Sequence, residues 1–240
     1  MRLDKFLSDM GIGTRSELKK TIKSGAVKVD GTVVRNPSFS VSPSSQVTIG
    51  GVPVVYEEFV YYMLNKPAGI ISASEDSREE TVVDLIAEPR RKDIFPVGRL
   101  DRDTEGLLLI TNDGDLAHRL LSPRHHVDKL YTAVVAGKIT EREVESFANG
   151  LILPDGLECL PATLEILSYD ENADTTAVNV TIQEGKFHQI KRMFEAVGSR
   201  VLYLKRQSMG TLELGSALAP GEYRRLTDEE LSGLKSLTNS

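Results

Sequence analysis

Residues 98–106 read Gly-Arg-Leu-Asp-Arg-Asp-Thr-Glu-Gly, and residues 107–110 continue as Leu-Leu-Leu-Ile. A charged loop therefore leads straight into a short apolar segment of the kind that forms a buried strand. Because loops carried on rigid structure usually present catalytic groups, Asp101 is a candidate for chemistry. The alternative is a polar turn in which Asp101 caps backbone amides, and for an isolated aspartate that reading is the more common one.

Calcium binding is another alternative for this loop, because Asp101, Asp103 and Glu105 imitate the first ligands of an EF-hand. The match fails further along, where the ninth position is Leu109 and the twelfth is Asn112 instead of glutamate. The segment that should stay in an ion-binding loop forms an apolar strand instead. We therefore expect no metal ion here.

Outward from the loop, strands and helices alternate. Helix starts are marked by capping boxes, in which Thr140 precedes Glu143 and Thr227 precedes Glu230. The strand-like runs are residues 61–64, 107–110, 131–135 and 177–182. This pattern predicts a mixed α+β architecture.

The N-terminal part predicts two helices followed by a hairpin. An apolar stripe in the first helix ends at Gly11, and the second helix runs from a capping box at Thr14 to Gly25. Residues 27–34 read as strand, Asp-Gly turn and strand. Residues 42–51 are polar and turn-rich, and residues 52–55 are strand-like. An N-terminal segment of about 55 residues has a small core and would be only marginally stable alone. We therefore expect its basic face to dock a partner and do not expect the segment to carry catalysis.

The formal net charge of −6 argues, taken whole, against a nucleic-acid partner. The distribution reverses that impression, because residues 1–50 hold eight Lys or Arg against four Asp or Glu. Residues 186–206 form a second basic stretch in which Glu195 is the one acidic residue. Since charges are screened within about 8 Å at physiological salt, a local basic face can attract RNA although the whole chain is acidic.

The composition, 40% hydrophobic and 27% charged over 240 residues, is that of a soluble two-domain protein. No signal peptide or membrane-spanning run is evident. Cys159 is the only cysteine, which agrees with a reducing compartment, and the four histidines show no HExxH pattern. We expect a cytoplasmic protein with no membrane partner and no zinc.

The N-terminal segments MRLDKFL and TRSELKKTIKSGAVKVDG resemble the S4-type RNA-binding domain. The later segments, in their order, resemble the RsuA branch of the pseudouridine synthases, and the match covers nearly the whole chain. These segments are MLNKPAG at 63–69, GRLD at 98–101 with GLLL at 106–109, SPRHH at 122–126, KLY at 129–131, EGKFHQIKRM at 184–193 and LAPGEYR at 218–224. We expect an S4-like α/β RNA-binding domain over residues 1–58 and a catalytic domain over residues 59–240. The catalytic domain should have a mixed, mainly antiparallel β-sheet flanked by helices.

The resemblance implies roles for three residues. Asp101 falls in the family's GRLD motif and would be catalytic, Tyr131 falls in the K-x-Y motif, and Lys191 falls where the family places the basic partner of the aspartate. Arginine is common there in related branches, and lysine keeps the charge but not the bidentate pairing. The chemistry as the family performs it requires no cofactor and no metal. Predicted RNA contacts are Arg2, Arg15, Lys19, Lys20, Lys23, Arg99, Arg124, His125, His126, Lys186, His188, Gln189 and Arg192.

The residues themselves agree with part of this assignment. An apolar helical stripe that Gly198 ends puts Lys191 in the first turn of a helix. A cation there opposes the helix dipole unless a carboxylate or phosphate sits in front of it. Tyr131, by its pattern alone, is an ordinary strand aromatic with its hydroxyl satisfied.

The resemblance implies that the protein isomerises a uridine of ribosomal RNA to pseudouridine, with the target base flipped into a pocket. Asp101 would act as an ionised group, attacking covalently or removing a sugar proton. The N-terminal match and SPRHH favour 16S rRNA. We further expect the substrate to be a partly assembled small subunit and the enzyme to be a monomer. The alternatives are a 23S rRNA synthase, a non-catalytic ribosome assembly factor, and a metal-dependent hydrolase using Asp101, Asp103, Asp113 and Asp115.

Overall fold

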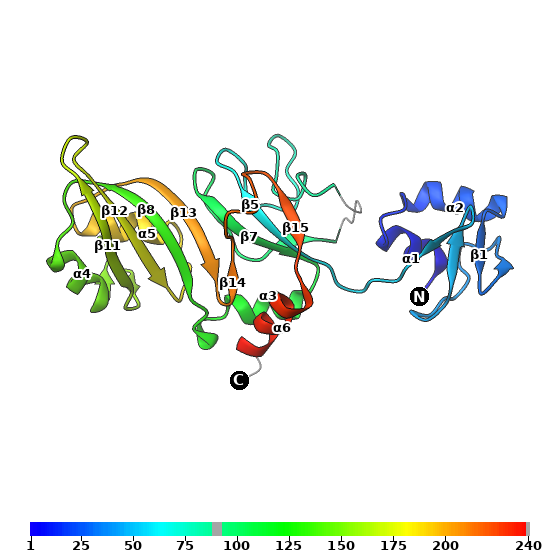
Figure 1. Ribbon diagram of the computed structural model, residues 1–240. Coiled ribbons are helices and arrows are strands. Elements are labelled where there is room, and N and C mark those ends of the chain that lie inside the picture. The colour runs from blue at the N-terminus through cyan, green and yellow to red at the C-terminus, as the bar shows by residue number, and fades with distance from the viewer. Residues whose placement is uncertain (88–92, 239–240) are drawn as a thin grey trace. The chain divides into compact units, whose positions relative to one another are not determined.

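The computed structural model describes residues 1–87 and 93–238. Backbone contacts divide the chain into two compact units (Figure 1). The N-terminal unit comprises Met1–Val60 with Asp84–Ile94, and the second unit comprises Tyr61–Val83 with Phe95–Ser240. Within the described ranges, no helix combines the length and the apolar character needed to cross a lipid bilayer.

In the N-terminal unit, two helices share one core with a four-stranded antiparallel sheet of order β2-β1-β3-β4. The predicted apolar stripe of the first helix is buried in that core, with Leu3, Phe6 and Leu7 all 0% exposed. The elements are α1 (Leu3–Asp9), α2 (Arg15–Ser24), β1 (Val27–Val29), β2 (Thr32–Val33), β3 (Val47–Ile49) and β4 (Val52–Val54).

Short sequence motifs correctly predicted the start of α2 and the turn between β1 and β2. The capping box at the start of α2 is formed, since the Thr14 amide donates to the Glu17 carboxylate at 2.9 Å. Asp30 and Gly31 both have positive φ, as a two-residue turn between β1 and β2 requires. The polar segment 42–51, in contrast, contains β3, which pairs with both β1 and β4. Its three strand residues are too few for a periodic pattern, so pairing with neighbouring strands decides their conformation.

The described part of the second unit contains a nine-stranded sheet whose main path is β11-β12-β8-β13-β7-β5-β15, with β14 beside β13 and β6 beside β7. All neighbours are antiparallel except β7 and β13, which confirms the predicted mainly antiparallel α+β fold. Its strands are β5 (Tyr61–Lys66), β6 (Phe95–Pro96), β7 (Glu105–Thr111), β8 (Lys129–Ala136), β11 (Thr163–Asp170), β12 (Thr175–Ile182), β13 (Val201–Met209), β14 (Leu212–Glu213) and β15 (Tyr223–Arg225). A separate ribbon pairs β9 (Leu151–Ile152) with β10 (Glu158–Cys159).

Helices cover this sheet in two groups. The helix α5 lies behind β8 and β12 in Figure 1, and Phe194 from α5 packs on Phe147 from α4 with ring centroids 5.0 Å apart. The helices α3 and α6 lie next to each other and share a core with β5 and β7 (Figure 1). The bounds are α3 (Gly114–Leu121), α4 (Glu141–Ala148), α5 (Gln189–Ala196), α6 (Asp228–Leu237) and a 3-10 turn, η1 (Pro123–His125).

The parallel contact between β7 and β13 depends on Gly106. Its φ is +104°, and a Cβ atom at this position would lie 2.2 Å from the backbone oxygen of Arg206. Because glycine has no Cβ atom, the backbone of β7 can lie against the backbone of β13 at this point. Across the sheet Gly106 is aligned with Arg206, Arg206 with Tyr131, and Tyr131 with Val180. This row brings the start of β7 close to the strand that carries Tyr131.

Candidate active site

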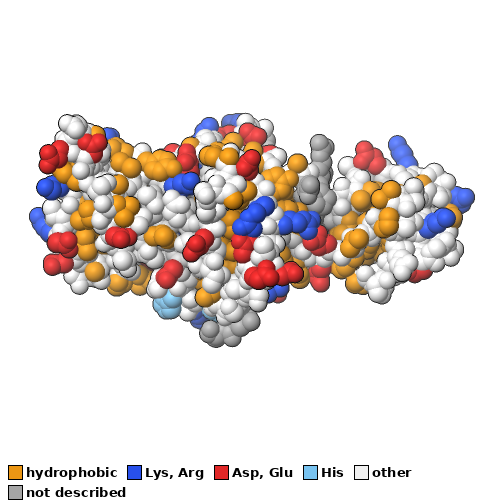
Figure 2. Space-filling view, in the orientation of Figure 1, with side chains coloured by type: hydrophobic (Ala, Val, Ile, Leu, Met, Phe, Trp, Pro, Cys, Tyr) orange, Lys and Arg blue, Asp and Glu red, His pale blue; other side chains and the backbone are white. Residues whose placement is uncertain are grey.

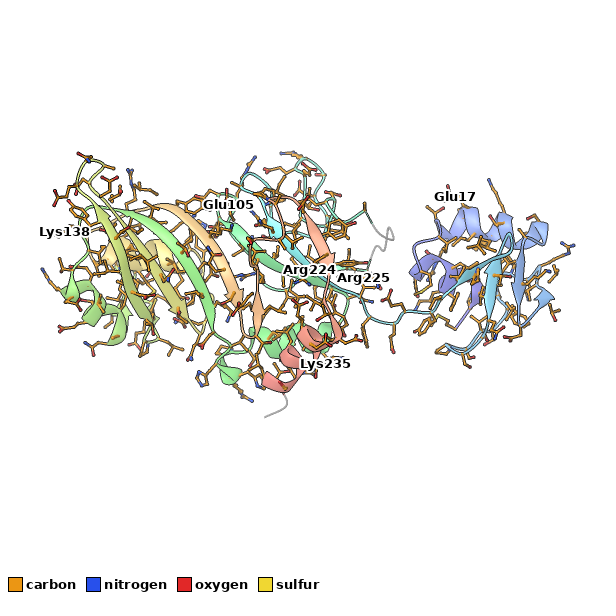
Figure 3. The ribbon with its side chains drawn as sticks, viewed as in Figure 1. Glu17, Glu105, Lys138, Arg224, Arg225 and Lys235 are labelled. Carbon is orange, nitrogen blue, oxygen red and sulfur yellow. The ribbon has the colours of Figure 1, made fainter. Side chains whose placement is uncertain are left out.

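Asp101 lies in the loop of residues 98–104, which ends where β7 begins at Glu105 (Figure 3). Hydrogen bonds fasten this loop to the segment after β5. The Ser72 hydroxyl donates to the Leu100 carbonyl at 2.8 Å and accepts from the Leu100 amide, while the Gly69 amide donates to the Arg102 carbonyl at 2.7 Å. The backbone on both sides of Asp101 is therefore held in place.

A buried lysine completes the anchoring. The Lys66 side chain is fully buried, and its Nζ donates to the carbonyl oxygens of Pro67 at 3.0 Å, Arg102 at 3.2 Å and Thr104 at 2.9 Å. Burial lowers the pKa of Lys66 to about 8, although nearby carboxylates, Asp103 foremost, oppose this. An ammonium that donates three hydrogen bonds to backbone carbonyls fixes the geometry of the loop.

Lys191 joins α5 to the loop. Its Nζ lies 2.9 Å from Oδ2 of Asp101 and 2.6 Å from Oδ1 of Asp103, so one ammonium pairs with two carboxylates. Nε2 of His188 lies 3.5 Å from the other oxygen of Asp101. Because Lys191 is in the first turn of α5, these carboxylates supply the negative charge that a cation needs there.

These contacts shift two pKa values. Burial acts to lower the pKa of Lys191, but the hydrogen bonds to Asp103 and Asp101 outweigh it, and the net shift is upward. The hydrogen bond from Lys191 lowers the pKa of Asp103, whose side chain is 74% exposed. Lys191 is therefore an ammonium throughout the neutral range.

Two cavities meet at Asp101. The narrow cavity, of about 60 Å³, has Tyr131 and Lys191 on its wall. The wide cavity, of about 530 Å³, also borders Asp101 and has Phe187 and Lys129 on its wall. Only 7% of Tyr131 is exposed, and the residue lines the narrow cavity from β8. The three residues singled out for catalysis, 30 and more positions apart in the chain, thus line one site.

A family model described as RNA pseudouridylate synthase matches residues 60–196, and a model of the S4 domain matches residues 1–47. The chain belongs to the RNA pseudouridylate synthase family. It is therefore a pseudouridine synthase, an isomerase, with an S4 domain at its N-terminus.

Named relatives match nearly the full length of this synthase. The uncharacterized RNA pseudouridine synthase YtzG of Bacillus subtilis is 51% identical over 96% of this chain and 97% of its own. Ribosomal small subunit pseudouridine synthase A of Escherichia coli is 39% identical over 98% of this chain and 100% of its own. Ribosomal large subunit pseudouridine synthase B of Bacillus subtilis is also 39% identical, over 99% of this chain and 97% of its own. A crystal structure of a pseudouridylate synthase aligns with a TM-score of 0.68 and 38% identity, over 98% of this chain and 99% of that one.

Some RNA contacts predicted in the synthase unit line the cavities, and others are engaged within the protein. Arg99, Lys186 and His188 border both cavities. The Gln189 amide lies 4% exposed and is used internally, donating to Glu184 at 2.6 Å and accepting from the Lys186 amide. Internal ion pairs also hold Lys186 to Glu184 at 2.8 Å and Arg192 to Asp155 at 2.5 Å. Arg124, His125 and His126 lie at η1, outside the walls of both cavities.

In the N-terminal unit the predicted contacts lie at the surface. Lys19, Lys20 and Lys23 are exposed on α2, and Arg15 is exposed at its start. The Arg2 guanidinium is paired with Asp4 through two hydrogen bonds of 3.0 and 2.7 Å. The face drawn in Figure 2 shows several Lys and Arg side chains on this unit. Three α2 lysines with no ion pair to the described residues are available to a phosphate backbone.

Sequence reasoning assigned no role to three residues at the site. Lys66 anchors the loop, and its only signal was its place inside the MLNKPAG segment. Arg206 is 3% exposed on β13, where its Nε donates to the Leu107 carbonyl at 2.7 Å. Its Nη2, like the hydroxyl of Thr104 on the narrow cavity wall, is buried with no partner among the described residues. An arginine at an inward position of an alternating strand was the available signal for Arg206.

Proposed function

We propose that this synthase isomerises a specific uridine of ribosomal RNA, in the 16S rRNA of the small subunit, with Asp101 as its catalytic residue. The observation that carries the proposal is the Asp101 carboxylate on its anchored loop, 2.9 Å from Lys191 and on the wall shared by both cavities. Groups held in one geometry by their surroundings are those that lower a reaction barrier.

The reaction breaks the bond between N1 of uracil and C1′ of ribose, turns the base, and joins C5 to C1′. The proton on C5 leaves, and N1 gains one, so no atoms are added or lost. An ionised Asp101 serves this reaction as a nucleophile or as a base towards the sugar. Lys191 holds that carboxylate in place, and no part of the reaction calls for a cofactor or a metal.

Tyr131 presents its ring to the base in the narrow cavity. That cavity is smaller than the roughly 300–1,000 Å³ usual for ligand pockets, so the side chains around it move when the base enters. A flipped base needs a surface in place of its lost stacking neighbours, and an aromatic ring supplies one. Basic residues around the cavities and on α2 hold phosphates without reading the sequence.

The choice of 16S rRNA rests on the small-subunit synthases among the relatives and on the SPRHH segment. A large-subunit relative is equally identical at 39%, so 23S rRNA is the second candidate. We propose that residues 1–58 dock the RNA and residues 59–240 carry the chemistry. The enzyme acts as a cytoplasmic monomer on a partly assembled subunit.

The deciding experiment maps pseudouridines in ribosomal RNA from cells with and without this protein, and again with Asp101→Asn restored. Loss of one 16S position that the wild type restores and Asp101→Asn does not restore supports the proposal. Loss confined to 23S rRNA moves the substrate to the large subunit. An unchanged pseudouridine map with defective subunit assembly would indicate a non-catalytic assembly factor.

A further inference from the structure

The side chain of Phe187 is 74% exposed although it lies on the wall of the wide cavity beside Asp101. Its ring stacks on the imidazole of His188, with ring centroids 3.8 Å apart and an angle of 18° between the planes. Single exposed apolar side chains are common on protein surfaces, so exposure alone assigns no function. The location of this one, at the active site and on top of a histidine, does require an explanation.

The backbone under this stack is also unusual. His188 has φ of +49° and ψ of +33°, the left-handed conformation, although it carries a side chain. Such residues are uncommon and cost conformational energy, and they cluster at functional sites. Here the conformation accompanies an imidazole 3.5 Å from Asp101 on one side and a stacked Phe187 on the other.

Basic side chains line the same cavity as the stack. The wall of the wide cavity includes the exposed Arg99 and Arg102 and the half-buried Lys186 together with Phe187. Proteins that bind single-stranded RNA combine aromatic rings, on which bases stack, with cations that follow the phosphates. Phe187 therefore has the surroundings of a base-stacking residue.

We propose that the Phe187–His188 stack is a platform for the base of the nucleotide adjoining the target uridine. This inference rests on the proposed function, which places the target at Asp101 and Tyr131. The narrow cavity has Tyr131 and Lys191 on its wall and lacks Phe187, whereas the wide cavity has Phe187 and lacks those two. Because Asp101 borders both cavities, a target base in the narrow cavity leaves the adjoining wide cavity for its neighbour in the chain. Stacking on Phe187 replaces the contact that the neighbour loses when the target leaves the helix.

The first test compares substitutions of Phe187 in kcat/KM on the RNA modified in the mapping experiment. Phe187→Ala should lower kcat/KM roughly 5- to 150-fold, the range of one lost base–aromatic stack. Phe187→Leu, which is apolar but not flat, should lose about as much, and Phe187→Tyr should restore activity. The matched control is Ile152→Ala, since Ile152 is 70% exposed in the same unit but lies away from both cavities. Wild-type kcat/KM in Phe187→Ala would overturn the proposal.

The second test observes the stack directly. The chain contains no tryptophan, so Phe187→Trp introduces a single reporter whose fluorescence is quenched by a stacked base. An Asp101→Asn background prevents turnover, and the probe is a short RNA carrying the mapped uridine. Quenching should persist when the target nucleotide is abasic and disappear when its neighbour is abasic. The opposite dependence would assign Phe187 to the target base, and no quenching by the intact RNA would rule out a platform.

Failure of this inference is distinguishable from failure of the proposed function. If Asp101→Asn keeps turnover, the assignment of the target to Asp101 fails whatever Phe187 does. If wild type is active and Asp101→Asn is not, while Phe187→Ala is fully active, only the platform is rejected. A folded state unchanged by circular dichroism in Phe187→Ala ensures that a loss of activity reports on RNA contact.

Discussion

The ammonium of Lys191 lies 2.9 Å from Oδ2 of Asp101, and it reaches Asp103 from the same position. The ion pair between Lys191 and Asp101 joins the first turn of α5 to the loop of residues 98–104. Lys66 and Ser72 hold the backbone of that loop by hydrogen bonds. The Asp101 carboxylate is thus held by a cation at a point that borders both cavities.

Asp101→Asn should abolish turnover, with a loss of at least about 10²–10⁴-fold, the range for a missing acid or base group. Size and fold are kept, so RNA affinity and the unfolding curve should stay near wild type. Asp103→Asn is the control: Asp103 also pairs with Lys191 but is 74% exposed and lies off both cavity walls, so turnover should persist. Single-turnover assays with radiolabelled RNA measure both. Substantial activity of purified Asp101→Asn would reject the catalytic assignment.

Two substitutions of Tyr131 distinguish a stacking role of its ring from a proton-transfer role of its hydroxyl. Tyr131→Phe keeps the ring, so RNA affinity should hold while turnover falls by about 10²-fold or more if the hydroxyl moves a proton. Tyr131→Ala should lose affinity as well as turnover. Rates and binding constants of the two variants on one RNA give the comparison, and wild-type behaviour of both would place Tyr131 outside the reaction.

Lys66→Met should destabilise the protein by about 2–4 kcal/mol, because three buried carbonyls lose a charged donor. The loss should grow as pH rises from about 8 towards 10.5. In the folded protein the pKa of Lys66 is about 8, below its ordinary value of 10.5, so in that window the unfolded chain binds more protons and wild-type stability rises with pH. The variant lacks this rise. Urea unfolding of both proteins across the window gives the measurement, and a pH-independent difference contradicts the assignment.

The triple variant of Lys19, Lys20 and Lys23 to Ala should weaken RNA binding and flatten its salt dependence. Each phosphate contact contributes about 0.7–0.9 to the slope of log affinity against log salt, so the magnitude of the slope should fall by roughly 2–3. The modified position and turnover at saturating RNA should not change, because these contacts serve ground and transition states alike. The measurement is RNA affinity of the wild type and the triple variant across a series of salt concentrations. An unchanged slope in the variant would contradict the docking role of α2.

Gly106→Ala should destabilise the protein by about 2–4 kcal/mol, because the new methyl group meets the Arg206 backbone at 2.2 Å. The matched control is Gly137→Ala, since Gly137 also has positive φ but open space at the Cβ position. The control should lose only about 1 kcal/mol, the cost of the backbone conformation. Thermal unfolding of the two variants separates the steric clash with Arg206 from the cost of the backbone conformation. Equal losses of stability in the two variants would show that the structure relaxes to relieve the clash.

The sequence predicted those parts of the fold that have local signals. Capping boxes at Thr14, Thr140 and Thr227 are formed, and the helix that carries Lys191 ends next to Gly198, as its apolar stripe required. The strand β3 was missed because only its pairing partners define it. Motif order led to Asp101, Tyr131 and Lys191, but no pattern in the chain could show that they line one cavity. Long-range strand pairing determines that.

The contact of Phe187 with His188 had no counterpart in the sequence analysis either. Exposed aromatic residues carry no periodic signal, and the left-handed backbone of a histidine cannot be recognised from its neighbours. Lys66 was equally hidden, since a lysine is ordinarily assigned to the surface. Both roles depend on tertiary contacts of the side chains, which form only when the chain has folded.

The position of β13 has a consequence for synthesis of the chain on the ribosome. It lies between β7 and β8, which are both complete 65 or more residues earlier in the chain, and it follows directly after α5. While the nascent chain is still short of residue 201, β7 and β8 each lack this neighbour and leave a row of amides and carbonyls unpaired. The ammonium that faces Asp101 is likewise made some 90 residues after Asp101 itself. The sheet is therefore complete only once β13 has been made, and a chain released before that point would expose unpaired strand edges that are prone to aggregate.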